Sequence, residues 1–463
     1  MQLLHSYQQM LQRRPMHHVE RQEEYVANPL NAFALLRRLQ QDWPKWLSYL
    51  QDDATRELLR LMQLQLAKAP SALDLKLATE GLLRIESFYD LEASHMAKGL
   101  LLQQQYNAHL NPADCMTLGS HLLNRSEYAK STHWFRTGLR HYKQPYGKLY
   151  GQVLGLKRQQ LSRAYALAIA RERKRLTDQH IPCIITDICT ADGDSEQQPR
   201  DKQTQEWQQL ADSMLNDMVL KASNAKIKKL TNEYLAGDEE IFIKERAKHK
   251  PKPTAMQRGC RGLWSKPRPQ RLNCSYLHDD TFQRLAPLKL EWLSVQPRIL
   301  LFHQVLSDSD IAVLRNVSLY STARDFAKQG AKLFPLSQTH AALQRKVALL
   351  LGTASTDLSL HVFNYGLGGY LQRNSKFTCR GAPTNTKSKT VKAQERCHSK
   401  HLATMLIYVS DVPLGGATIF TKLQLLVQPK KGNALVWMNR DNDFRPEQLT
   451  EHAVCPVVVG SRW

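Results

Sequence analysis

Eight cysteines provide the chain's most reactive side chains, and their spacing limits the chemistry that they can do. No two of them form a Cys-x-x-Cys pair, so a zinc centre of that kind is not expected. Cys260 and Cys274 are near enough in sequence to close a small loop as a disulfide in an oxidising compartment. The spacing therefore predicts either a Cys260–Cys274 disulfide or two reduced thiols.

Basic side chains could bind an acidic partner, since the chain carries a net charge of +22. Residues 244–271 hold ten Lys or Arg and one acidic residue, Glu245, which supplies +9 of that total. Four prolines in the same stretch are typical of a linker. A nucleic acid, a membrane surface or an acidic protein would fit such a charge, and so would a set of solvated basic faces. No zinc-finger spacing or aromatic-rich RNA-binding motif accompanies it, which argues against nucleic acid.

The chain shows no targeting or membrane-spanning segment. No run of 18 or more apolar residues occurs, so no membrane span is expected. The first fourteen residues are polar and lack the apolar core of a signal peptide. Entry into the secretory pathway is therefore not expected from this chain alone; a mis-assigned start or another entry route are the alternatives. Asn-x-Ser sequons occur at Asn124, Asn273 and Asn316, about as many as chance supplies, and they receive no role.

Residues 3–180 have a helical pattern. An apolar stripe at spacings of three and four predicts an amphipathic helix that Pro44 divides or kinks; its members are Phe33, Leu36, Leu39, Trp43, Trp46 and Leu50. This stripe suits either a self-associating helix pair or packing within one domain. Residues 111–142 predict two helices with a turn near Arg125 and Ser126, and 148–177 predict a second pair. Both tetratricopeptide-like units and plain helical hairpins fit this pattern.

Beyond Trp292 the pattern changes to short strands. Strand-like runs occupy 299–302, 358–365, 402–409, 423–427, 434–437 and 457–459, and glycine-rich turns separate several of them. Strands at such spacing indicate a β-sandwich or barrel. We therefore expect an α+β multidomain chain in which helical regions precede a β domain.

Seven stretches resemble one known family. In the C-terminal part these are "PRILLFHQVLSDSDI" (297–311), "NYGLGGY" (364–370), "LIYVSDVPLGGATIF" (406–420), "PKKGNALVWMN" (429–439) and "HAVCPVVVGSRW" (452–463). Upstream they are "NPLNAFALLRRLQQDW" (28–43) and "GLLRIESFYDLEASHMAKG" (81–99). In this order they resemble the prolyl 4-hydroxylase alpha subunit, a member of the 2-oxoglutarate and Fe(II) dioxygenase superfamily.

The resemblance implies a domain order. It assigns a helical, dimerisation-like region to 1–105 and a helical, tetratricopeptide-like peptide-binding region to 106–243. A basic linker would occupy 244–290. A dioxygenase-like double-stranded β-helix, or jelly roll, would occupy 291–463.

The family's properties follow from the same resemblance. The reaction would be 4-hydroxylation of peptidyl proline in procollagen-like chains, with Fe(II), 2-oxoglutarate and ascorbate. Expected partners are a proline-rich or collagen-like peptide, protein disulfide isomerase and a second copy of the chain, in the lumen of the endoplasmic reticulum. Family members continue beyond the position of Trp463, and the resemblance puts the partner of Cys455 in that continuation.

The iron ligands implied by the resemblance are altered here. The family holds Fe(II) with a His-x-Asp pair and a distal His, leaving positions for 2-oxoglutarate and oxygen. In "GGYLQRNSKF" (368–377) the pair reads Asn374 and Lys376, while the distal His matches His452. A Lys ammonium about 4 Å from a divalent ion is repelled by about 8 kcal/mol at an effective dielectric constant near 20. Whether the chain is an enzyme is therefore left open, with a pseudoenzyme as the first hypothesis.

Other residues bear on the same site. The resemblance assigns the outer carboxylate of 2-oxoglutarate to Arg462, where the family has Lys, and a planar guanidinium suits a carboxylate. The alternative is a surface Arg. His361, His398 and His401 could form a displaced iron site or be ordinary histidines. Three hypotheses result: an impaired homologue that keeps binding or assembly, an active proline dioxygenase with displaced ligands, and a basic module for an acidic protein or nucleic acid.

Overall fold

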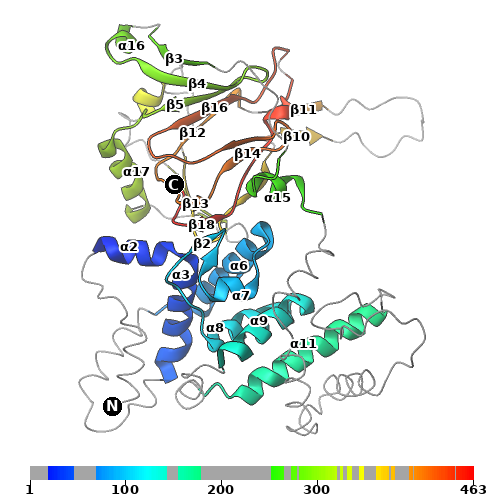
Figure 1. Cartoon of the computed structure of the whole chain (residues 1–463). Helices are drawn as coiled ribbons and strands as arrows, with labels where there is room; N and C mark the ends of the chain where they lie inside the picture. Colours follow the sequence, from blue (N-terminus) through cyan, green and yellow to red (C-terminus); the bar gives the residue numbers. More distant parts are fainter. Residues whose placement is uncertain are drawn as a thin grey trace, which may run out of the picture. The chain divides into compact units, whose positions relative to one another are not determined.

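The computed structural model divides into two compact units, residues 1–252 and 253–463 (Figure 1). The described residues are 19–45, 69–142, 155–178, 252–264, 273–278, 281–320, 324–326, 331–335, 344–348, 361–374, 377–380, 396–399, 401–443 and 445–463. Among the described helices, none combines the length and apolar character that a membrane crossing requires.

The described part of the first unit begins with four helices and one π-helical turn. They are α2 (Val19–Ala27), α3 (Pro29–Arg37), the π-helical turn η1 (Arg38–Asp42), α6 (Ala72–Tyr89) and α7 (Ala93–Ala97). Asn28 caps α3, and its side chain accepts a hydrogen bond from the backbone of Leu30. Pro44 has no amide hydrogen, and the π turn lies directly before it, as expected where a proline disturbs helical hydrogen bonding. The helix expected here is confirmed for its described part; Trp46 and Leu50 lie outside the described residues.

Three further helices follow a small hairpin of β1 (Leu100–Leu101) and β2 (Gln104–Gln105). They are α8 (Pro112–Asn124), α9 (Tyr128–Tyr142) and α11 (Arg158–Asp178). The expected turn near Arg125 and Ser126 is confirmed between α8 and α9. Of the helix pair expected over 148–177, the described residues contain one helix, α11; residues 148–154 lie outside the described part of the chain. These helices enclose a cluster of buried side chains: Phe135, Leu139, Leu161, Tyr165, Ala166, Ala168 and Ile169.

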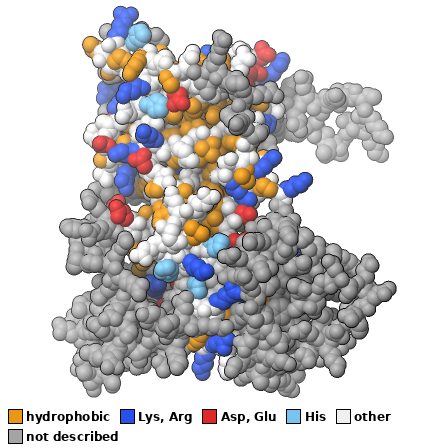
Figure 2. Space-filling model, viewed as in Figure 1, with side chains coloured by type: hydrophobic (Ala, Val, Ile, Leu, Met, Phe, Trp, Pro, Cys, Tyr) orange, Lys and Arg blue, Asp and Glu red, His pale blue; other side chains and the backbone are white. Residues whose placement is uncertain are grey.

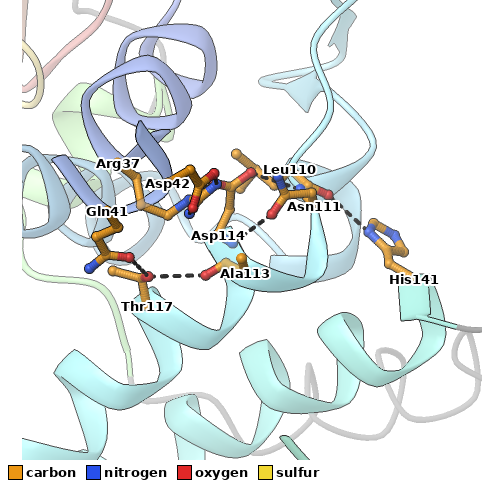
Figure 3. A network of polar contacts seen from close by, with 9 residues as sticks. All are labelled: Arg37, Gln41, Asp42, Leu110, Asn111, Ala113, Asp114, Thr117 and His141. Atoms are coloured by element: carbon orange, nitrogen blue, oxygen red, sulfur yellow. Dashed lines mark hydrogen bonds and ion pairs between the residues drawn. The ribbon is translucent and has the colours of Figure 1, made fainter. Parts of the chain in front are cut away.

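A buried charge network joins α3 to α8 (Figure 3). The guanidinium of Arg37 donates to both carboxylate oxygens of Asp42 at 2.7 Å and also to Asp114, and all three side chains are almost fully buried. Asp114 additionally accepts a hydrogen bond at 2.8 Å from the backbone of Asn111, which caps α8. The network therefore holds the start of α8 against the π turn.

The second unit is built on a five-stranded antiparallel sheet. Its strands run in the spatial order β12 (Ala403–Ile407), β16 (Ala434–Met438), β5 (Ile299–His303), β4 (Leu288–Ser294) and β3 (Cys274–Leu277). Side chains alternate between its faces. Phe302 and Val436 pack on the face covered by α17 (Asp308–Tyr320), whereas Leu301 and Trp437 belong to the cluster on the other face.

A four-stranded antiparallel sheet packs against that other face. It is formed by β15 (Leu425–Val427), β14 (Thr418–Phe420), β17 (His452–Val454) and β9 (Leu371–Asn374). Phe420 and Val427 share the inner cluster with Leu435 and Trp437 of the larger sheet. The mixed α and β class with antiparallel sheets is therefore confirmed. Smaller sheets complete the described part: β6 (Arg324–Phe326), β7 (Ala331–Pro335) and β8 (His361–Tyr365); β13 (Leu414–Gly415) and β18 (Val457–Val459); β10 (Phe377–Arg380) and β11 (Arg396–Ser399).

The cysteine pairing differs from both sequence expectations. Cys260 at the end of α15 (Ala255–Cys260) is bonded to Cys455, which is 195 residues away in sequence. Cys274 is a free, exposed thiol. The expected Cys260–Cys274 bond is wrong, and Cys455 does not need a partner beyond Trp463. The error arose because sequence spacing cannot show that α15 packs on the strand next to Cys455.

The segment assigned to a basic linker contributes to the second unit from position 253 onwards. Met256, Cys260 and Trp264 pack on the outer face of the four-stranded sheet, against Ile419 and Ala453. Further along, the same segment contains β3 and the short helix α16 (Thr281–Leu285). The strands that carry Thr418 and His452 are therefore backed by α15 and linked to it by a disulfide.

Candidate functional site

The inner face between the two sheets of the second unit collects polar groups among apolar ones. Thr418 and Phe420 on β14 and His452 on β17 lie on this face, because Ile419 and Ala453 between them belong to the outer cluster. Arg462 reaches the same region from the chain's last described residues, where its backbone forms a bridge with Tyr365. We take this inner face as the candidate site.

Arg462 is the centre of the polar contacts. Its guanidinium donates to the carbonyl oxygen of Gly416 at 2.5 Å and to the hydroxyl of Thr418 at 2.9 Å. It lies over the ring of Tyr408, 5.3 Å from the ring centroid, and 5.7 Å from the centroid of Tyr365. The side chain is 2% exposed, so it is not the surface arginine considered as the alternative.

The carbonyl that Arg462 contacts is set by two glycines. Gly415 and Gly416 have φ angles of +79° and +66°, in the left-handed region that favours glycine. A Cβ atom on Gly415 would lie 2.5 Å from the backbone oxygen of Pro456, so a larger residue would displace the backbone. The turn at residues 415–418 therefore places both the Gly416 carbonyl and the Thr418 hydroxyl beside the guanidinium of Arg462.

The charge of Arg462 has no carboxylate partner among the described residues. Burial lowers the pKa of its guanidinium, while the neighbouring Tyr408 and Tyr365 act in the opposite direction. Burial also raises the pKa of both tyrosine hydroxyls, so these groups are neutral at pH 7. A buried cation surrounded by neutral oxygens and rings is an arrangement that a carboxylate ligand would stabilise.

His452 lies on the same face and is held by aromatic rings. Its ring centroid is 4.6 Å from that of Trp437 in an edge-to-face contact, and 6.0 Å from that of Phe420. Nδ1 is 3.1 Å from the carbonyl oxygen of Thr450, a distance at which a protonated Nδ1 donates. His452 is 7% exposed, so the orientation is fixed by packing.

The position opposite His452 is Asn374. The two residues are backbone partners across β17 and β9, so the first and last ligand positions implied by the resemblance are neighbours in the sheet. Lys376 lies outside the described residues. Among the described residues, no group of three or more His, Cys, Asp or Glu side chains is arranged to hold a metal ion. One imidazole beside a neutral Asn position does not make up the two-His, one-carboxylate set that Fe(II) requires.

The other histidines considered for an iron site are placed differently. His361 at the start of β8 and His401 before β12 are exposed, unlike the buried His452. His398 lies on β11, of which only the backbone is described. Asp411 is exposed and accepts a hydrogen bond at 2.8 Å from the backbone of Lys431.

Four site residues escaped the sequence analysis: Tyr365, Tyr408, Thr418 and Trp437. All four lie within the quoted motifs, and Tyr408 and Thr418 are joined by a hydroxyl–hydroxyl hydrogen bond of 2.7 Å. The indole nitrogen of Trp437 is buried and has no hydrogen-bond partner among the residues that the structure describes; the residue is 2% exposed. The available signal for Thr418 was a polar residue next to the apolar Ile419 and Phe420.

One face of the molecule shows how the described basic side chains are distributed. On the face drawn in Figure 2, the described Lys and Arg side chains lie in several separate groups, with acidic side chains among them. Of the basic segment 244–271, only residues 252–264 are described.

Comparison with known proteins agrees with the motif resemblance. Residues 1–103 match the family profile described as the N-terminal region of the prolyl 4-hydroxylase alpha subunit. The human prolyl 4-hydroxylase subunit alpha-1 is 25% identical over 467 residues, which cover 95% of this chain and 82% of the human one. The chicken subunit alpha-2 is 26% identical over 471 residues, with the same two coverages. A Caenorhabditis elegans subunit alpha-2 is 25% identical over 476 residues, covering 95% of this chain and 80% of that one.

Solved structures include a similar protein. The viral collagen prolyl hydroxylase of Paramecium Bursaria Chlorella virus-1, solved as a 2OG complex, is 20% identical, with a TM-score of 0.27; the match covers 35% of this chain and 90% of that one. The profile match at the N-terminus and the sequence relatives, which cover 95% of the chain, agree: the chain is similar to prolyl 4-hydroxylase alpha subunits along nearly its whole length.

Proposed function

We propose that this chain is a prolyl 4-hydroxylase alpha-subunit homologue that binds 2-oxoglutarate or a similar dicarboxylate but is impaired in iron-dependent hydroxylation. The proposal is carried by a difference between two parts of the inner face, the anion-binding position and the iron-binding position. Arg462 is buried without a carboxylate partner among the described residues, whereas the position paired with His452 is occupied by Asn374.

Arg462 would bind the outer carboxylate of the dicarboxylate through its free guanidinium edge. Its contacts with Gly416 and Thr418 fix the plane of the guanidinium, so little side-chain entropy is lost when the ligand binds. The hydroxyl of Tyr408, which already contacts Thr418, is a further group that can donate to a carboxylate oxygen. The rings of Tyr408 and Tyr365 keep water from the guanidinium and strengthen the charge interaction.

Iron would be held poorly. In the family, Fe(II) bound to two His and one carboxylate supplies the redox chemistry of hydroxylation. Here the residues written at those positions are Asn374, Lys376 and His452, which provide one good donor, one weak neutral donor and a cation. The retained role would then be binding: of a dicarboxylate, of a proline-rich or collagen-like peptide by the helical, tetratricopeptide-like region, and of assembly partners.

The cellular location and the partners that we expect are those of the family. We infer a location in the lumen of the endoplasmic reticulum, with protein disulfide isomerase and a second copy of the chain as partners. The Cys260–Cys455 disulfide supports this inference, since such bonds persist in oxidising compartments and are rare elsewhere. Ascorbate would have a role only if iron chemistry is retained. The jelly-roll description of the β domain belongs to the same set of family expectations.

Calorimetric titration with 2-oxoglutarate, first without metal and then with Fe(II) under anaerobic conditions, tests the proposal. We expect binding without metal and no appreciable gain in affinity when Fe(II) is added. A matched variant, Asn374→His with Lys376→Asp, should make the affinity depend on Fe(II). Absence of binding in both conditions would contradict the proposal, and strong iron dependence in the unaltered chain would favour an active enzyme with displaced ligands.

A further inference from the structure

The five-stranded sheet of the second unit has one open edge, at β3. This strand is paired with β4 on one side, and among the described residues no strand pairs with its other side. Cys274, Ser275 and Tyr276 are exposed, and Tyr276 is 64% exposed. An open edge offers unpaired backbone groups to any extended chain that meets it, so folded proteins usually protect such edges.

The usual protections are absent from β3 itself. Its sequence, Cys-Ser-Tyr-Leu, contains no lysine, no acidic residue and no proline, although the strand is only four residues long. Two exposed apolar side chains lie before and after β4, the only strand paired with β3 in the described part: Leu285 on α16 is 85% exposed and Val295 is 53% exposed. Without a further cover, the open edge of β3 is a place for self-association.

Asn273, directly before β3, offers an attachment point for such a cover. Asn273, Cys274 and Ser275 form an Asn-x-Ser acceptor sequence for N-linked glycans. The side chains of Asn273 and Ser275 are exposed and make no hydrogen bond within the described part of the chain. The middle residue is a free thiol, so no disulfide restrains the sequence. Only the backbone of Asn273 is engaged, through its carbonyl oxygen and the amide of Trp292 at 3.1 Å.

The other two acceptor sequences are presented less well. Asn124 is the last residue of α8, and the hydroxyl of its partner Ser126 accepts a hydrogen bond from Tyr128. Asn316 lies within the helix α17, where residues two apart do not face each other. In the extended chain at β3, by contrast, residues two apart lie on the same side.

We propose that Asn273 carries an N-linked glycan and that this glycan covers the open edge of β3. The proposal uses the inferred lumenal location but is independent of the dicarboxylate site. A bulky, hydrated glycan at the start of the strand would prevent a second chain from pairing with the backbone beyond it. The free thiol of Cys274 would be shielded by the same group.

Expression of the full chain in animal cells, with a cleavable secretion signal fused to its N-terminus, tests the site whatever the natural route of entry. After enzymatic deglycosylation, peptide mass spectrometry should identify residue 273 as Asp. The glycan should disappear in Asn273→Gln and in Ser275→Ala, and should persist in Ser275→Thr. An unmodified Asn273 in the secreted wild-type protein would overturn the proposal.

The covering role is tested on the same proteins by light scattering at increasing concentration. Asn273→Gln should self-associate more than the wild-type protein, and Asn124→Gln serves as the matched control that should not. Adding Tyr276→Lys to Asn273→Gln should reduce the association, because a charge on the edge replaces the missing cover. Equal association of Asn273→Gln and wild type would overturn the covering role. Titration of the same proteins with 2-oxoglutarate measures the dicarboxylate site independently, so failure of the glycan proposal can be distinguished from failure of the proposed function.

Discussion

Replacement of Arg462 by methionine should remove most of the affinity for 2-oxoglutarate. The substitution keeps an unbranched side chain of similar length but removes the guanidinium that contacts Gly416 and Thr418. A buried carboxylate would then lose its only cationic partner among the described residues of the site.

The magnitude follows from the strength of the hydrogen bond between the guanidinium and the ligand carboxylate. A hydrogen bond to a charged group contributes about 1.5–3 kcal/mol. Because 1.4 kcal/mol corresponds to a factor of ten in the dissociation constant, the affinity should fall by about 10- to 100-fold. Arg462→Lys keeps the charge without the planar fork, so its affinity should lie between those of the wild type and Arg462→Met.

Titration calorimetry with 2-oxoglutarate measures this change, and thermal unfolding without ligand provides the control. Removal of two hydrogen bonds is partly offset by removal of a buried charge that has no carboxylate partner among the described residues. The ligand-free stability should therefore change by less than about 2 kcal/mol. Unaltered 2-oxoglutarate affinity in a folded Arg462→Met protein would refute the assignment of the anion site.

Three further perturbations test other parts of the structure. Arg37→Met leaves the buried carboxylates of Asp42 and Asp114 without the guanidinium that binds both. The free energy of unfolding of the first unit, measured with denaturant, should fall by about 3–5 kcal/mol. An equal fall on replacement of a surface arginine would contradict this reasoning. Burial raises the pKa of Glu86 from 4.5 to about 7, so the folded state binds more protons than the unfolded state between these values. Stability should therefore fall by up to roughly 3 kcal/mol as the pH rises through that window, and Glu86→Gln should flatten the profile in pH-dependent unfolding. The double variant Cys260→Ser with Cys455→Ser should destabilise the second unit by about 2–5 kcal/mol, and a thiol reagent should label only Cys274 among these three in the unreduced wild-type protein.

Local patterns predicted much of the fold. Each of the six strand-like runs contains a strand of the structure, and the turn at Arg125 and Ser126 separates two helices as expected. The strands β14 and β17 were missed because each is a three-residue strand that includes a polar side chain, Thr418 or His452, whereas the equally short β15 and β18 are wholly apolar. These two strands carry Thr418 and His452, so the elements that hold the site were the hardest ones to predict.

Long-range contacts account for the remaining differences. The pairing of Cys260 with Cys455 depends on α15 packing against a strand far along the chain, and no sequence spacing records that contact. Likewise, Arg462 was identified through its motif, but Tyr365 lies on β8 and Tyr408 follows β12, and only the fold brings the two rings to one guanidinium.

The most direct test of impaired hydroxylation is an assay of the purified chain, assembled with protein disulfide isomerase, with Fe(II), 2-oxoglutarate, ascorbate and a Pro-Pro-Gly repeat peptide. The site as described, with Asn374 beside His452 and Arg462 intact, predicts bound 2-oxoglutarate, no stoichiometric iron and no hydroxyproline. Hydroxyproline formation at rates typical of enzymes, together with one tightly bound iron per chain, would contradict it.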